Sequence, residues 1–199
     1  KFGYGLITEF VLAKNYSFLT GVEVNYVGGT INYDPNKVFY KVNDSTALFL
    51  KSREYKQQYV TIPLALKLKT NEIGYMTYFA QIGVDASFKI KGRANDSGTL
   101  YSADSTGAFT VKGLDYSKSD VDILKQIQLF RVALNVGVGA EWNIAGNTSL
   151  LFALNYNNGF TNFFYNKTND TNKLADRTGK KVEEKASSNY VALTVGVLF

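Results

Sequence analysis

The sequence predicts an all-β fold, an antiparallel up-and-down barrel, on three observations. Seven segments alternate apolar and polar residues with a period of two, which is the period of a strand and not of a helix. The connections between these segments alternate strictly between short and long. The chain also holds 14 Tyr, 14 Phe and 17 Gly among its 199 residues, a composition typical of all-β proteins. A chain of this length is expected to form a single domain over residues 1–199.

The seven predicted strands each carry their bulky apolar residues on one face. In chain order they are residues 2–12, 18–26, 60–69, 78–90, 130–142, 148–156 and 190–199. Most have nine or more residues, which is the length of a tilted strand that crosses a membrane. Pro63 lies inside the third strand, where a proline cannot donate a hydrogen bond, so it predicts a missing bond in the ladder.

The lengths of the connections indicate which of them lie at each rim of the predicted barrel. The short ones are Ala13–Tyr16, Thr70–Met76 and Ile144–Asn147, and the long ones are Gly28–Tyr55, Gly92–Asp122 and Asn157–Ser187. Consecutive connections of an up-and-down barrel lie at opposite ends, so all the short ones share one rim. Short periplasmic turns and long extracellular loops are typical of outer-membrane barrels. Each long connection contains one Asn-Asp pair (Asn43-Asp44, Asn95-Asp96 and Asn169-Asp170), which we interpret as turn residues.

The composition of the two strand faces favours a membrane over water. The polar face holds Gly, Ala, Asn, Ser and ionisable residues, which is too polar for a dry core. The apolar face ends in aromatic residues that are expected to lie at the membrane interfaces, namely Tyr26, Tyr78, Trp142, Tyr156 and Phe199. The sequence therefore predicts a protein of the bacterial outer membrane, in contact with lipid. The alternative is a soluble lipocalin-like ligand-binding barrel, in which the two faces would be inverted.

The odd number of predicted strands needs an explanation, because bacterial single-chain barrels have even numbers. We expect eight strands, of which seven are visible in the sequence and one lies upstream of residue 2. In that case the first and last strands lie on either side of the additional strand, and otherwise they pair directly. The alternative is that a long connection contains a hidden pair of strands.

Seven ionisable residues fall on the predicted inner face, namely Glu9, Glu23, Lys67, Asp85, Lys89, Arg131 and Glu141. Side chains fill the interior of an eight-stranded barrel, and isolated buried charges are costly, so these groups should pair. We expect Arg131 to pair with Glu23 or Asp85, and Lys67 to pair with Glu9 or Glu141. These residues then form a polar plug that holds the barrel closed. The alternative is an ion or proton path through a narrow channel for small solutes.

The absence of two residue types argues against an enzyme. The chain contains no histidine and no cysteine, so the nucleophilic and acid–base machinery built on an imidazole or a thiol cannot be assembled. We therefore expect no catalytic residues, no cofactor and no metal. The net charge of +5 is spread along the chain without a block of like charges, so nucleic acid is not expected as a partner.

Aromatic residues in the long connections are the candidates for contact with a partner. They are interspersed with small polar residues, a mixture that suits adaptable interfaces, and the candidates are Tyr40, Tyr101, Tyr116, Phe163 and Phe164. The alternative is that these rings pack against one another as a lid over the barrel mouth.

Four short motifs resemble the PorT-like small outer-membrane β-barrel family. They are Tyr59–Lys67, which is similar to the "IPLLLK" strand of that family, Gly21–Tyr26 followed by Gly28-Gly29, Phe79–Gly83, and Asn157–Asn162. The resemblance implies an eight-stranded barrel without a shared enzymatic activity, and some relatives take part in secretion or in outer-membrane assemblies. The end of the chain, Val197-Leu198-Phe199, resembles the signal that the barrel-assembly machinery reads. The expected function is therefore a structural or interaction role in the outer membrane.

Overall fold

A computed structural model of the chain describes residues 2–34, 37–162, 164, 174–175 and 185–199. It consists of one antiparallel sheet of nine strands. The strands are β1 (Gly3–Ala13), β2 (Tyr16–Asn32), β3 (Phe39–Asn43), β4 (Thr46–Lys69), β5 (Met76–Ala103), β6 (Phe109–Asp122), β7 (Phe130–Ala145), β8 (Thr148–Gly159) and β9 (Asn189–Leu198). A 3₁₀ turn, η1, spans Leu124–Gln126. No helix in the described part of the chain is both long and apolar enough to cross a membrane.

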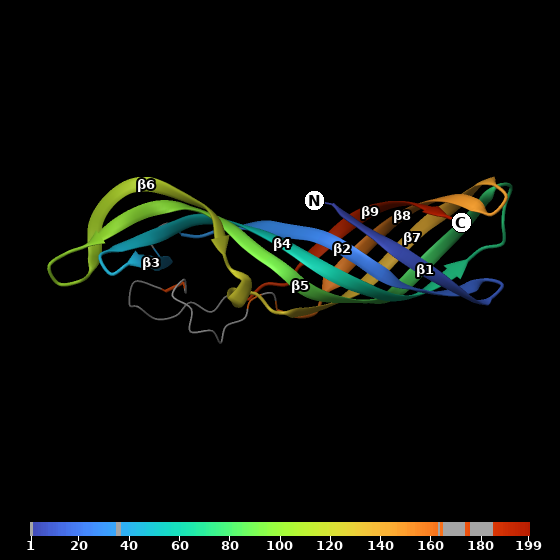
Figure 1. Ribbon diagram of the computed structural model, residues 1–199, viewed down its shortest axis with the longest axis horizontal. Coiled ribbons are helices and arrows are strands. Elements are labelled where there is room, and N and C mark those ends of the chain that lie inside the picture. The colour runs from blue at the N-terminus through green and yellow to red at the C-terminus, as the bar shows by residue number, and fades with distance from the viewer. Residues whose placement is uncertain (1, 35–36, 163, 165–173, 176–184) are drawn as a thin grey trace.

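Seven of the strands form the curved wall of the barrel, in the order β1-β2-β4-β5-β7-β8-β9. The turns that join β1 to β2, β4 to β5 and β7 to β8 all lie at one end, which we call the short-turn rim (Figure 1). Gly146 in the β7–β8 turn has φ of 55°, a left-handed conformation that a glycine adopts without strain. The predicted placement of the short connections at one rim is confirmed.

The seven predicted strands are the seven of the barrel wall, but two of the long connections also contain strand structure, which the prediction did not place. Strand β4 begins at Thr46 and β5 continues to Ala103, while β3 and β6 pair with their far ends. We call this part the distal sheet; it consists of β3, β6, residues 46–58 of β4 and residues 91–103 of β5, and it extends away from the barrel (Figure 1). The end of β2, residues 26–32, pairs with residues 52–58 of β4 at its base. Both of its faces bury apolar residues, so its sequence lacks the period-two pattern that marks the barrel strands.

Two β-bulges keep the inner face continuous from the distal sheet into the barrel. The β4–β5 register shifts once between Leu50 and Ser52 and again between Gln58 and Tyr59. The first shift adds Lys51 to β4 and the second adds Ile90 to β5, and each extra residue reverses the alternation of one strand. As a result, the residues that face the lumen and those that face the inside of the distal sheet lie along the same side of the two strands.

Pro63 interrupts the barrel wall as its position predicts. The pairing of β2 with β4 stops after Thr20 and Leu64 and resumes at Glu23 and Thr61 without a change in register. The missing bond in the ladder is therefore confirmed. The wall keeps its alignment because the neighbouring residues on β5 pair with β4 continuously, including Asp85 with Pro63.

The sheet is open between β1 and β9, which do not pair with each other in the described residues. Six antiparallel pairings separate these two strands, so they run in the same direction. They cannot close the barrel as an antiparallel pair. One strand running in the opposite direction would pair antiparallel with both, which is the arrangement expected of an eight-stranded barrel.

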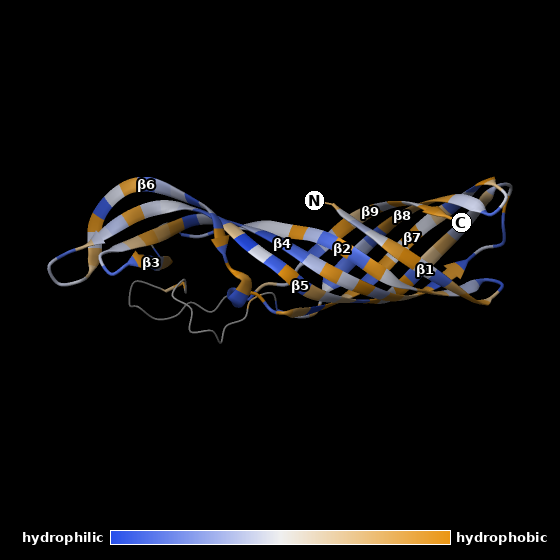
Figure 2. Cartoon of the chain, in the orientation of Figure 1, coloured by the Kyte–Doolittle hydropathy of each residue, from blue (hydrophilic) through white to orange (hydrophobic). Residues whose placement is uncertain are grey.

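Hydrophobic and hydrophilic residues alternate along the strands of the barrel (Figure 2), and the apolar ones are exposed on its outer wall while polar ones such as Lys67 and Asp85 are buried. Leu6 and Leu193 leave 83% and 75% of their surface uncovered, which only a lipid environment makes favourable for so continuous a surface. The aromatic residues predicted at the membrane interfaces are all exposed on this outward face, namely Tyr26, Tyr78, Trp142, Tyr156 and Phe199. The rings of Phe88 and Phe130 add a further outward pair, with centroids 5.1 Å apart.

Candidate functional site: the polar lumen and the distal sheet

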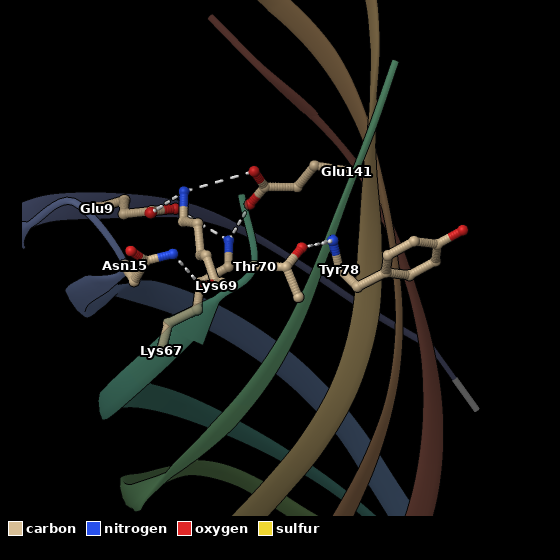
Figure 3. A network of polar contacts seen from close by, with 7 residues as sticks. All are labelled: Glu9, Asn15, Lys67, Lys69, Thr70, Tyr78 and Glu141. Carbon is tan, nitrogen blue, oxygen red and sulfur yellow. Dashed lines mark hydrogen bonds and ion pairs between the residues drawn. The ribbon is translucent and has the colours of Figure 1, made fainter. Parts of the chain in front are cut away.

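A cluster of two lysines and two glutamates fills the lumen near the short-turn rim (Figure 3). Lys67 on β4 forms ion pairs with Glu9 on β1, at 2.9 Å, and with Glu141 on β7. Lys69 pairs with the same two carboxylates, and its carbonyl accepts a hydrogen bond of 2.7 Å from Asn15. Both partners that the sequence offered for Lys67 are therefore used. The cluster joins three strands across the lumen.

The aromatic ring of Phe79 contacts this cluster. The Nζ atom of Lys67 lies 4.2 Å from the centroid of the Phe79 ring, a cation–π contact. The ring lies across Gly139, where a Cβ atom would collide with it. A glycine at this position therefore makes room for the ring, and the ring in turn fills lumen volume that water would otherwise occupy.

The second expected ion pair, between Arg131 and Glu23 or Asp85, does not form. Arg131 on β7 donates instead to the side-chain oxygen of Asn157 at 2.5 Å. The amide nitrogen of Asn157 donates to Asp85 at 2.5 Å, and Asn135 donates to the same carboxylate at 3.1 Å. Asn157 thus stands between the cation and the carboxylate. It lies on β8, and its position relative to Arg131 depends on a strand register that the sequence does not reveal.

The remaining two predicted lumen residues are also held by neutral partners. Glu23 accepts a hydrogen bond of 3.2 Å from Asn25 on its own strand. Lys89 donates to the backbone carbonyls of Leu124 and Ile127, the latter at 2.5 Å. Lys89 therefore anchors the segment around η1 at the end of the barrel opposite the short-turn rim. Because Ile127 also packs near Gly92, this segment covers the inner face where the barrel meets the distal sheet.

The inner face of the distal sheet contains a buried ion pair that the sequence analysis missed. Arg53 on β4 donates to both carboxylate oxygens of Asp96 on β5, at 2.6 and 2.8 Å, and both side chains are 0% exposed. Tyr40 on β3 donates to Asp96 at 2.9 Å, and its ring lies 5.5 Å from the Arg53 guanidinium. The pair thus joins β3, β4 and β5. Asp96 belongs to an Asn-Asp pair that we interpreted as a turn, and that interpretation is wrong because both residues lie within β5.

These contacts fix the ionisation of the buried groups. Burial alone would lower the pKa of Arg53, but the hydrogen bonds and the charge of Asp96 outweigh it and raise that pKa above its ordinary value. Burial and the Asp96 charge raise the pKa of Tyr40 well above its ordinary range. Arg53 therefore stays charged and Tyr40 stays neutral at any physiological pH, so the pair acts as a permanent brace.

The aromatic residues proposed for partner contact divide into core and surface. Tyr40 and Phe164 are buried, with 1% and 5% exposure, so their prediction as surface contacts is wrong. Phe164 packs edge-on against Tyr55 with centroids 5.5 Å apart, and Tyr101 packs on Phe49 at 4.5 Å. Tyr116 remains exposed. Phe163 lies outside the described residues. The packing of loop rings on one another, which was part of the alternative prediction, is found for Tyr101 and Phe164.

An apolar outer wall, a polar lumen and short turns gathered at one rim together define a transmembrane β-barrel. The model of the family described as "outer membrane protein beta-barrel domain" matches residues 1–165. The chain belongs to that family and resides in the bacterial outer membrane. The comparisons with curated proteins and with solved structures gave no match. The finer resemblance to PorT-like proteins stays a prediction.

The chemistry open to these sites is that of charge pairing and hydrogen bonding. In the described part of the chain, no group of three or more His, Cys, Asp or Glu side chains is arranged to hold a metal ion. The lumen cluster has four charges that balance one another, and the Arg53–Asp96 pair balances itself. Both networks are therefore neutral in total charge.

Proposed function

We propose that the protein is an interaction component of the outer membrane, in which the barrel is the anchor and the distal sheet is the working part. The observation that carries this proposal is the internal construction of the distal sheet. Two apolar clusters cover its opposite faces, one around Tyr40, Leu48 and Leu50 and the other around Phe39 and Phe49. A connection that merely closed a barrel would need neither a two-sided core nor a buried ion pair.

The orientation follows from the lengths of the connections. Long connections face the cell exterior in outer-membrane barrels, so the distal sheet extends from the outer surface and the short-turn rim faces the periplasm. Partners of the distal sheet are then surface proteins or other components of an outer-membrane assembly. Exposed apolar side chains on β6, at Val111 and Leu114, offer the contact surface together with Tyr116. In this proposal the protein catalyses no reaction.

Insertion into the membrane is assigned to the barrel-assembly machinery. The terminal Val197-Leu198-Phe199 supplies the alternating pattern, and the Phe199 ring is fully exposed at the end of β9. The apolar outer wall then contacts outer-membrane lipid.

The competing function is a narrow channel, which requires a continuous open lumen. Two features of the described residues argue against it. The Lys67–Glu9–Glu141 cluster occupies the lumen near one rim. The segment held by Lys89 covers the inner face near the other. We expect the full-length protein to show no stable conductance steps in planar lipid bilayers.

Orientation can be tested directly because the chain has no native cysteine. Thr106→Cys lies in the β5–β6 turn at the tip of the distal sheet, and Lys14→Cys lies in the β1–β2 turn as the matched control. A membrane-impermeant maleimide should label the first variant in intact cells and the second only after the outer membrane is permeabilised. The reverse pattern would contradict the orientation.

Partner contact is tested by a photo-crosslinking amino acid at single exposed positions. Leu114 and Tyr116 probe the distal sheet, and Leu193 probes the lipid-facing wall. We expect defined protein adducts from the distal positions and lipid adducts from Leu193. Protein adducts only from Leu193 would instead make the barrel wall the interface, and conductance without adducts would favour the channel.

A further inference from the structure

Arg131 is a buried cation whose direct partners are all neutral. Its side chain is 7% exposed, and its Nη2 atom donates to Asn157 at 2.5 Å and to the carbonyl of Ser188 at 2.9 Å. The guanidinium lies 5.6 Å from the centroid of the Tyr190 ring. Among the residues that the structure describes, no carboxylate lies within 4.0 Å of it, in contrast to Arg53, which has Asp96. Asp85 reaches it only through the Asn157 amide.

One donor of this cation has no partner among the described residues, and the residue lines a small cavity. The Nε atom of Arg131 is buried and has no hydrogen-bond partner in the described residues. Arg131 also lines a small cavity of about 10 Å³, together with Tyr59, Gln128, Thr161, Asn162 and Ser188. That volume accommodates roughly one atom of the size of a water oxygen. A buried donor on a charged group costs free energy while it has no partner. A ligand atom that accepts a hydrogen bond from it therefore recovers that cost as binding free energy.

This small cavity, which we call the slot, adjoins a much larger cavity that opens to solvent. Thr161 and Asn162 line both, and the larger cavity has a volume of about 400 Å³. Binding cavities for small molecules have volumes in this range. Its wall adds a second cation, Lys185, and an apolar side chain, Phe160, which is exposed. Together, the two cavities place the buried cation Arg131 at one end and a larger, solvent-open volume lined by charged and apolar side chains at the other.

We propose that these cavities form a binding site for a small solute with an oxyanion group, a carboxylate or a phosphate. One oxygen enters the slot and accepts a hydrogen bond from Arg131 Nε, and the body of the solute occupies the larger cavity beside Lys185. The negative charge gives Arg131 a directly bonded acidic partner, which Asp85, held beyond Asn157, does not provide. A water molecule would satisfy the donor but not the charge. The site lies in the barrel and is separate from any partner of the distal sheet.

The test follows the Arg131 Nε–H group by nitrogen-15 NMR of the full-length chain folded in detergent micelles. The signal is assigned by its loss in R131K. Sodium acetate and sodium phosphate are added separately, with ionic strength held constant by sodium chloride. We expect a saturating shift of this signal with at least one of the two, and the tighter one identifies the group. A short-chain phosphatidic acid in the micelle distinguishes a phosphate carried by lipid from a soluble one.

Variants around the larger cavity keep the test independent of Arg131. Asn162→Asp places a negative charge where the cavities meet and should weaken binding at least tenfold. Lys185→Gln removes an exposed charge and should weaken it about two- to fivefold, the range of a solvent-exposed ion pair. Lys14→Gln makes the same charge change at the distant β1–β2 turn and should have no effect.

Three outcomes would overturn the proposal. The first is a shift that grows linearly without saturation, and the second is an equal shift with chloride alone. The third is an equal loss of affinity in K185Q and K14Q, which would reveal general screening. Each variant is first checked for heat-modifiable migration on electrophoresis, so that a folding failure is not counted as a loss of binding.

Discussion

Strand β4 supplies the cations of two buried ion-pair networks on the same inner face, one in the barrel with Glu9 and Glu141 and one in the distal sheet with Asp96. In the barrel, Lys67 is shared by two carboxylates that keep 13% and 11% of their side chains exposed. In the distal sheet, Arg53 and Asp96 form a closed pair with no exposure at all. The difference follows from what surrounds each part. Lipid outside the barrel drives polar groups inward, whereas water around the distal sheet drives apolar groups inward from both faces.

This comparison teaches that a charge network costs more where its surroundings are apolar on every side. The barrel network has neighbours such as Asn15 and a second lysine, which can replace a lost partner. The distal pair lies on the face of the sheet that holds the apolar cluster around Tyr40, Leu48 and Leu50, and the further polar contacts of its side chains in the described residues are with Tyr40 and Gln126. The same amount of burial therefore implies different sensitivity to substitution.

The largest effect is expected from Asp96→Asn. The substitution leaves the Arg53 charge buried without a counter-ion, and breaking such a pair costs about 3–5 kcal/mol. We expect the distal sheet to unfold locally while the barrel remains intact. Limited proteolysis of folded protein should cleave within residues 39–58 or 91–122, with heat-modifiability retained. Unchanged protease resistance would show that the pair is not the brace of this sheet.

A smaller effect is expected from Lys67→Met. Glu9 and Glu141 lose one cation but keep Lys69, so the loss should be about 2 kcal/mol, in the range of a hydrogen bond to a charged group. The measurement is urea unfolding in detergent followed by heat-modifiable migration. The matched control is Lys69→Met, which removes the more exposed lysine and should cost less. A larger effect in the control would invert the assigned roles of the two lysines.

A still smaller effect is expected at the surface of the distal sheet. Lys51 and Asp115 form an ion pair of 3.1 Å, with side chains 44% and 72% exposed. A double-mutant cycle with Lys51→Ala and Asp115→Ala should give a coupling of about 0.2–1 kcal/mol, which shrinks in high salt. A coupling as large as the loss expected for Asp96→Asn would contradict the argument that burial determines how much an ion pair contributes to stability.

The smallest effect is expected in the β5–β6 turn. Hydrogen bonds from Thr106, Thr110 and the Ala108 backbone hold the pKa of the exposed Asp104 at about 2, below the ordinary 3.8. Because the folded pKa is lowered, the stabilisation of this turn is complete above about pH 4 and is lost as the pH falls through about 2. Amide exchange at Thr106, compared with Asp104→Asn, should show this loss. A midpoint near pH 4 would mean that these bonds do not favour the carboxylate.

The comparison also explains which contacts could be predicted. Residues 60–69 alternate cleanly, and Lys67 lies near the short-turn rim, so its partners Glu9 and Glu141 followed from strand faces alone. Arg131 was placed on the correct face, but the β7–β8 register that brings Asn157 beside it is not visible in the sequence. Faces can be predicted from periodicity, whereas contacts between distant strands require the register.

The distal sheet could not be predicted for a different reason. Arg53 and Asp96 lie between two β-bulges, and apolar residues cover both faces beyond them, so the alternation that marks a strand is lost. The residue types also misled, since Asn95-Asp96 and Asn43-Asp44 are common in turns. The second pair does lie at a turn, the one between β3 and β4.

The unbroken course of β4 and β5 sets how far the protein stands above the membrane. Their 24 and 28 residues far exceed the nine to eleven that a tilted strand needs to cross the bilayer. At roughly 3.3 Å per residue, the excess corresponds to a reach on the order of 50 Å. The two strands pair with each other from the tip of the distal sheet to the short-turn rim, with register shifts only at Leu50/Ser52 and Gln58/Tyr59, so the distal sheet is continuous with the barrel wall. A load applied to the tip is therefore transmitted along these two strands into the barrel wall.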